Sequence, residues 1–169
     1  MTTLSLSSLK LRSGESYRDE REIELEPITL GGQRYLPVPG KVLALLDVSR
    51  ATTGTVFELD FVVRLHGPCY RCAADAVVDQ RVSAREYQAS SPGEAEELRT
   101  PYVVDDRLDL SAWARDALVL ALPEKILCRA TCAGLCPVCG VDMNENWHTH
   151  DEVVPDPRWA ALAELRERL

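Results

Sequence analysis

The chain has 169 residues, a size typical of one domain with a small appendage. Hydrophobic residues make up 46% and charged residues 27%, a globular balance that provides for a buried core. The net charge is −8, and most of it lies in residues 69–169, which argues against a broad basic face for nucleic acid. Because the sequence lacks a long apolar run and a secretory signal pattern, we expect a cytoplasmic protein without a membrane segment.

Alternating apolar and polar residues predict a set of neighbouring strands. The clearest run is VFELDFVVRL at residues 56–65, where every second side chain is apolar. Similar runs at residues 42–48 and 76–88 flank it across short turns, and weaker candidates lie at residues 21–28 and 33–38. We therefore expect an antiparallel meander or a partly open barrel, with one face on the core and the other mostly in solvent.

A loop and a helix are predicted to follow these strands. Residues 90–106 are acidic and contain two prolines, which is typical of a loop. LDLSAWARDALVLALP at residues 108–123 has apolar residues at helical spacing, so we predict a packed helix over about 109–122. Asp109 or Ser111 can cap its start, and Pro123 ends it. The fold class is therefore α+β, with a β-rich body at residues 1–126.

A second helix is predicted at the C-terminal end of the sequence. Asp156 precedes Pro157 at the start of DPRWAALAELRERL, and an apolar stripe that includes Trp159 and Leu162 follows. We expect residues 151–169 to dock on the body through this stripe, with partner binding as the alternative.

Four pairs of soft ligands mark the sequence as metal-binding. Six cysteines without a secretory signal favour a metal site over disulfides. Zinc suits a set of thiolate and imidazole ligands, and eight of them provide two tetrahedral sites. The pairs are Cys69 and Cys72, Cys128 and Cys132, Cys136 and Cys139, and His148 and His150.

Loop length favours one assignment of these pairs to two zinc ions. Only eight residues separate Cys139 from His148, so a local site closes at a small entropic cost. Site one then contains Cys69, Cys72, Cys128 and Cys132, and site two contains Cys136, Cys139, His148 and His150. Residues 127–150 would form a zinc-binding segment that shares site one with the body. The alternative combines both CxxC pairs as a ribbon-like site and leaves Cys128, Cys132, His148 and His150 for the other.

Further residues are expected to support these two sites. Gly140 follows the CPVC turn and permits a positive φ. Arg71 and Arg129 lie inside the site-one pairs and can offset its −2 charge or donate hydrogen bonds to sulfur, unless they are only exposed surface residues. The spacing of His148 and His150 is shorter than in most zinc fingers, and His66 is a substitute if one of the two is not a ligand.

The same residues argue against catalysis. The sequence has no Gly-rich phosphate loop, GxSxG or HExxH motif. A catalytic zinc keeps one position open, whereas eight matched ligands fill both sites. CYRC (residues 69–72) precedes a predicted strand, so it lacks the helix that a thioredoxin-like redox site needs. We therefore expect no enzyme, no catalytic residue and no small-molecule substrate.

The cysteine blocks and the sequence between them resemble the YceD family, bacterial and plastid proteins linked to accumulation of large-subunit ribosomal RNA. The resemblance includes CYRC at residues 69–72, LVLALP at 118–123, CRATCAGLCPVCGVDMN at 128–144 and the tail DPRWAALAEL. Many relatives have Cys-x-Cys where this chain has His148 and His150, and histidine can replace cysteine at zinc. Some relatives lack the CPxCG block, which favours our assignment of the pairs.

The resemblance implies a non-enzymatic factor in large-subunit ribosome biogenesis. Its partner would be a ribosomal protein or a large-subunit ribosomal RNA precursor. The acidic charge favours a basic ribosomal protein. Two alternatives remain at this point: a zinc-dependent or redox-active enzyme that uses a CxxC site, and an interaction adaptor unrelated to ribosomes.

Overall fold

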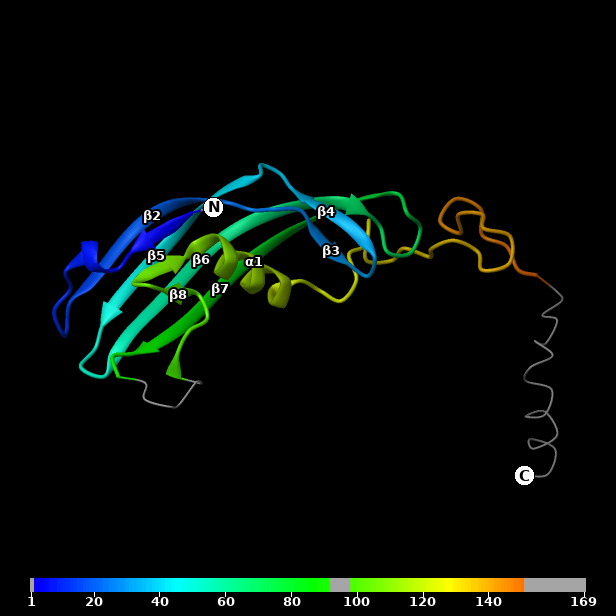
Figure 1. Ribbon diagram of the computed structural model, residues 1–169. Coiled ribbons are helices and arrows are strands. Elements are labelled where there is room, and N and C mark those ends of the chain that lie inside the picture. Colours follow the sequence, from blue (N-terminus) through cyan, green and yellow to red (C-terminus); the bar gives the residue numbers. More distant parts are fainter. Residues whose placement is uncertain (1, 92–97, 151–169) are drawn as a thin grey trace, which may run out of the picture.

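The computed structural model describes residues 2–91 and 98–150, which form a curved antiparallel sheet, one α-helix against a face of it, and an arm (residues 124–150) that extends past one end (Figure 1). The strands of the main sheet are β2 (Ser16–Glu24), β3 (Ile28–Leu30), β4 (Gln33–Pro37), β5 (Lys41–Arg50), β6 (Gly54–Pro68) and β7 (Asp75–Ala89). A smaller sheet contains β1 (Thr3–Ser5), β8 (Val103–Val104) and β9 (Arg107–Asp109), and the helices are η1 (Ser7–Leu9) and α1 (Leu110–Ala121).

The predicted meander is confirmed by three long strands. β5, β6 and β7 are consecutive and antiparallel, with Phe61 of β6 opposite Ala44 of β5 and Val82 of β7. β2 extends the sheet beyond β5, and β4 pairs with the last part of β6. Within the described residues β2 pairs only with β5 and β7 only with β6, so the sheet is not a closed barrel.

The core lies between the sheet and α1. Alternate residues of β6, from Phe57 to Leu65, are buried as the period of two predicts. From the helix, Trp113 and Leu118 complete the same core, and the Trp113 ring stacks on Tyr102 with 6.3 Å between ring centroids. The described chain is mostly β, so α+β fits it only loosely.

The helix begins and ends close to the predicted residues. The Asp109 side chain accepts a hydrogen bond from the Ala112 backbone N–H at 3.0 Å, which makes Asp109 the N-cap, and the helix ends two residues before Pro123. None of the described helices combines the length and the hydropathy that a membrane-spanning segment requires. The helix predicted within residues 151–169 lies outside the described residues.

The predicted loop at residues 90–106 contains one short strand that the sequence analysis missed. Val103 and Val104 form β8, which pairs with β9, and β9 pairs with β1 near the N-terminus. A two-residue strand gives no alternating pattern, and its partner β9 is held in turn by β1, about 100 residues earlier in the chain, so only the tertiary fold defines β8. Residues 92–97 of this loop lie outside the described residues.

Trp113→Ala is expected to destabilise the fold strongly, because Trp113 is 1% exposed and joins α1 to the sheet. Truncation of a buried tryptophan removes about 3–5 kcal/mol from the free energy of unfolding. Leu120→Ala is the matched control, since Leu120 lies in the same helix but is 87% exposed. Urea unfolding followed by circular dichroism measures both, and equal effects of the two substitutions would contradict this placement of the core.

Candidate metal centres

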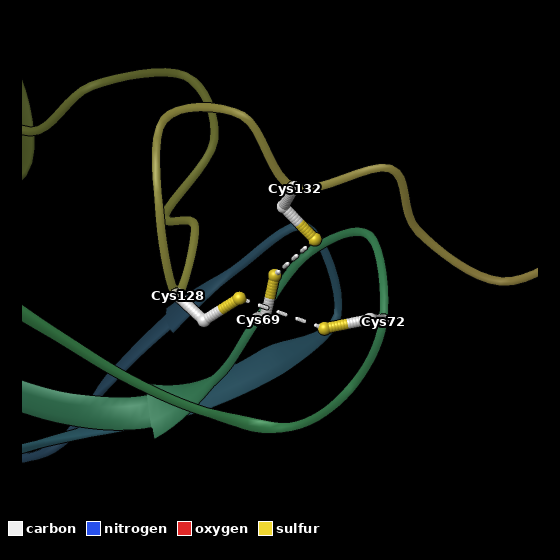
Figure 2. Close-up of side chains that lie close together, drawn as sticks. All are labelled: Cys69, Cys72, Cys128 and Cys132. Carbon is white, nitrogen blue, oxygen red and sulfur yellow. Dashed lines mark hydrogen bonds between the residues drawn. The ribbon is translucent and has the colours of Figure 1, made fainter. Parts of the chain in front are cut away.

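Cys69 and Cys72 lie in the turn that joins β6 to β7. The turn is closed by two backbone hydrogen bonds, from Cys69 N to Ala74 O at 2.7 Å and from Ala73 N to Cys69 O at 3.0 Å. Ala73 adopts a positive φ of 60°, which reverses the chain within a few residues. Both thiols are buried, and Figure 2 shows their sulfurs close to those of Cys128 and Cys132 in the segment that follows α1.

Cys128 and Cys132 lie in the segment that follows α1, and this segment packs against the β6–β7 turn. Ile126 is 1% exposed, and its carbonyl accepts a hydrogen bond from Tyr70 N at 2.8 Å, which fastens the start of the arm to the β6–β7 turn. The chain then turns back through a bond from Cys132 N to Arg129 O at 3.1 Å. Cys132 is fully buried and Cys128 is the most exposed of the four.

These four cysteines converge with the spacing of a tetrahedral metal site (Figure 2). The Sγ atoms of Cys69 and Cys132 are 3.7 Å apart, as are those of Cys72 and Cys128, and all four lie within 4.8 Å of one another. Sulfurs about 2.3 Å from a central zinc at tetrahedral corners would be about 3.8 Å apart. The four-cysteine cluster could therefore hold a metal ion, with one sulfur at each corner.

The surroundings of this cluster favour a cation among the sulfurs. Burial raises the pKa of the Cys69 thiol, but backbone N–H groups, first that of Cys128, donate to its sulfur and bring the pKa down to about 6. A backbone hydrogen bond from Ala74 lowers the pKa of Cys72, whereas burial and the neighbouring thiols raise it to about 12. One thiolate thus forms easily and the next does not, because negative charge accumulates in a buried space. A bound cation removes this conflict and lets all four thiols ionise.

The two arginines predicted to support this cluster have different surroundings. Arg71 donates from its guanidinium to the Cys132 carbonyl at 2.6 Å, and its backbone N–H donates to the Cys69 sulfur at 3.4 Å. It therefore joins the two halves of the cluster, through a carbonyl and a backbone group. Arg129 is exposed, and its side chain forms no hydrogen bond or ion pair within the described part of the chain.

The second cluster is built within a compact turn of the arm. Leu135 and Asp142 form an antiparallel bridge, and between them Cys136 N donates to Val141 O at 2.8 Å and Gly140 N to Cys136 O at 2.9 Å. Gly140 has φ 74°, the positive value predicted for the position after CPVC. This turn brings Cys136 and Cys139 to the two histidines that follow. Cys136, Cys139, His148 and His150 offer ligand atoms within 4.8 Å of one another.

One of the two histidines of this cluster, His148, is oriented for metal binding. His148 Nδ1 donates to the Asn146 carbonyl at 2.8 Å, which raises the pKa of His148 and leaves Nε2 as the atom that faces the other ligands. Nε2 is 3.1 Å from both Cys139 Sγ and His150 Nε2. Ligands of one tetrahedral zinc would be about 3.3–3.6 Å apart. This cluster could also hold a metal ion, and it is the more exposed of the two.

Backbone hydrogen bonds prepare the sulfur of Cys136 for the same purpose. The N–H groups of Cys139 and Val138 donate to it and bring its pKa down to about 6, below the usual value of a thiol. Donors of this kind stabilise a thiolate, the form in which cysteine binds metal.

Two residues that were not predicted from the sequence, Asn144 and Gly134, hold the arm against the four-cysteine cluster. Asn144 donates from Nδ2 to the Cys132 sulfur at 3.5 Å and accepts at Oδ1 from Ala133 N at 2.8 Å. Gly134 has φ 83°, and a Cβ there would lie 3.2 Å from Arg71 atoms, so this position favours glycine. Both residues are part of the block CRATCAGLCPVCGVDMN. Their place in this block, which carries the resemblance to the YceD family, was the available signal.

The structure thus brings the eight predicted ligands together in the two predicted groups, and each group contains two of the four sequence pairs. The ribbon-like combination of the two CxxC pairs is not the arrangement seen. All six cysteines are free thiols in the structure. His66 is exposed on β6 and belongs to neither cluster.

One family model spans both cysteine blocks of the chain. The family model described as "Large ribosomal RNA subunit accumulation protein YceD" matches residues 57–166, a range that contains every residue of both clusters. The chain belongs to the YceD family. The expected resemblance is therefore confirmed, and the family description connects the chain to accumulation of the large ribosomal subunit RNA.

Relatives of this YceD-family protein occur in mycobacteria. Proteins of Mycobacterium tuberculosis (strain H37Rv) and Mycobacterium bovis, both described as uncharacterized, are 31% identical over 169 residues, which covers 96% of this chain and 80% of each relative. A Mycobacterium leprae protein, also described as uncharacterized, is 39% identical over 71 residues, which covers 41% of this chain and 32% of that protein. No solved structure matches the chain significantly.

Proposed function

We propose that the protein is a non-enzymatic zinc-binding factor for the large ribosomal subunit, with one Zn²⁺ in each cluster. The sulfur spacing of 3.7 Å in the four-cysteine cluster supports zinc, because it fits a tetrahedral tetrathiolate site. Each cluster offers four protein ligands and so leaves no position for a water or substrate. That composition supports a structural role rather than catalysis by the metal.

The proposed role of these ions is to fix the arm on the body. The four-cysteine cluster connects the β6–β7 turn to residues 128–132, and Asn144, which lies between the second cluster's Cys139 and His148 in the sequence, donates to the Cys132 sulfur. A partner would then meet the arm and the sheet as one preformed surface, with less conformational entropy lost on binding.

The proposed partner is a ribosomal protein, with the large-subunit ribosomal RNA precursor as the second candidate. The observation that supports a ribosomal role is the family match over residues 57–166. The net charge of −8 favours a basic ribosomal protein over bare RNA, since opposite charges accelerate and orient association. The proposed site of action is the cytoplasm, where ribosomal subunits assemble.

Sedimentation of cell lysates tests the ribosomal role. We expect the tagged protein to migrate with large-subunit precursors, and deletion of its gene to lower large-subunit ribosomal RNA relative to small-subunit RNA. Ribonuclease treatment before capture separates the partners, because a protein contact survives it and an RNA contact does not. Absence from the precursor fractions together with normal ribosomal RNA after deletion would contradict the role.

A further inference from the structure

β7 is a long edge strand whose outer side has no strand partner within residues 2–91 and 98–150. It pairs with β6 along all fifteen of its residues, from Asp75 to Ala89, and contains no proline. An edge of this kind presents backbone N–H and C=O groups to any strand of matching sequence. The side chains along the edge therefore decide which strand can pair with it.

The first eleven residues of β7, DAVVDQRVSAR at 75–85, are complementary to themselves in the antiparallel direction. A two-fold axis through Gln80 places each residue opposite a matching residue of a second copy. Acidic residues then face basic ones and apolar residues face apolar or small ones. The opposed pairs are Asp79 with Arg81, Val78 with Val82, Val77 with Ser83, Ala76 with Ala84, and Asp75 with Arg85.

The two faces of the sheet separate these pairs by chemistry. Asp75, Asp79, Arg81 and Arg85 are exposed on the solvent face, where opposite charges on paired strands attract. Val78 lies on the other face, only partly buried against the core. A second strand beside it would extend the apolar side of the sheet as well as its ladder of hydrogen bonds.

The charged groups at the centre, Asp79 and Arg81, are both exposed. Arg81 is exposed and its side chain forms no ion pair within the described residues. Asp79 is oriented by Arg64 of β6, which donates from Nε to Oδ1 at 2.7 Å and from Nη2 to Oδ2 at 2.8 Å, and 57% of the Asp79 side chain is still exposed. The Gln80 side chain donates to the Arg81 carbonyl at 2.9 Å in an exposed bond that a second strand would replace.

The opposite edge strand, β2, has a charged residue at the centre of the corresponding self-pairing. Its charges also alternate, but a two-fold axis that opposes Asp19 and Arg21 passes through Glu20 and brings two carboxylates together. Thr2 also donates from its hydroxyl to the Glu22 carbonyl on β2. The neutral Gln80 at the centre of β7 has no such repulsion, so self-pairing is favoured at β7.

We propose that two copies of this chain associate through antiparallel pairing of their β7 strands about a two-fold axis at Gln80. The interface is isologous, since each copy contributes the same eleven residues. The two main sheets then form one continuous sheet. The metal clusters and the arm lie outside this contact, so the dimer is independent of the proposed ribosomal role.

Complementary charge reversals test the register of this pairing. Arg81→Asp places acidic groups opposite one another, and Asp79→Arg places basic groups opposite one another, so each variant alone is expected to be monomeric. Like charges at both central contacts should raise the dimer dissociation constant more than about 100-fold. An equimolar mixture of the two variants restores both opposite-charge contacts and is expected to form a heterodimer. Sedimentation velocity over a concentration series measures each species.

Arg18→Asp is the matched control, because Arg18 is an exposed arginine on the opposite edge strand. This variant is expected to dimerise as the wild type does. Circular dichroism and metal content confirm that each variant is folded. A monomeric wild type overturns the proposal and leaves the edge to a different partner. Dimers that survive both charge reversals, or a mixture that stays monomeric, overturn the pairing through β7.

Discussion

Cys132→Ser is expected to release the metal ion of the four-cysteine cluster and leave the second cluster loaded. Cys132 is fully buried, and its sulfur lies 3.7 Å from that of Cys69. A serine hydroxyl is a much weaker zinc ligand than a thiolate. Structural zinc contributes about 10–16 kcal/mol in small zinc domains, which equals or exceeds the total stability of most domains. Elemental analysis should therefore find one zinc per chain in place of two.

The loss should also free the arm from the β6–β7 turn. Ile126 and Cys132 are held there by hydrogen bonds from Tyr70 and Arg71 that depend on the closed cluster. Faster hydrogen exchange is expected in residues 124–135, while the meander keeps its protection because its own core remains. Thr131→Ser, at the exposed neighbouring position, should change neither the metal content nor the exchange. Two retained zinc ions in Cys132→Ser would refute the four-cysteine site.

Local sequence pattern was sufficient for the meander and for α1. Alternation in β6 is nearly unbroken from Phe57 to Leu65, and the structure buries these same positions. The helix was recognisable because Asp109 and Pro123 mark its ends and apolar residues recur between them. In both elements the pattern repeats over nine residues or more, so neighbouring positions support the same conclusion.

Features that depend on distant contacts were not predictable in this way. β8 exists because β9 pairs with it and with β1. No local pattern in Val103 and Val104 predicts this pairing. The open sheet follows from the absence of pairing between β2 and β7 within the described residues, a relation that periodicity does not encode. Both questions concern the placement of strands far apart in sequence.

The metal clusters were predictable from the sequence only in part. Ligand type and spacing were enough to group the eight residues, because each pair is local and loop length limits the combinations. The contacts that orient the ligands were not visible, since the roles of Asn144 and Gly134 arise only when the arm folds against Arg71. Spacing therefore predicted where a metal could bind, and the structure adds how the two clusters are joined.

The double substitution Cys136→Ser and Cys139→Ser is expected to remove the other zinc and loosen residues 133–150, while the sheet and the four-cysteine cluster stay intact. The second cluster closes within the arm, so its loss has no direct effect on the β6–β7 turn. Elemental analysis should again give one zinc per chain. Hydrogen exchange should rise in residues 133–150, whereas in Cys132→Ser it should rise in residues 124–135, where the arm joins the body.

The double substitution is also expected to weaken metal binding at the four-cysteine cluster, because the Asn144 side chain belongs to the arm and donates to the Cys132 sulfur. Loss of such a supporting hydrogen bond lowers metal affinity about 10- to 100-fold, so the remaining zinc should bind more weakly but still be retained. Competition with a chelator measures this shift. Val138→Ser is the control, since Val138 is exposed between the two cysteines and should preserve both ions. Loss of both ions in the double variant would show that the clusters form one cooperative unit and would refute two separable sites.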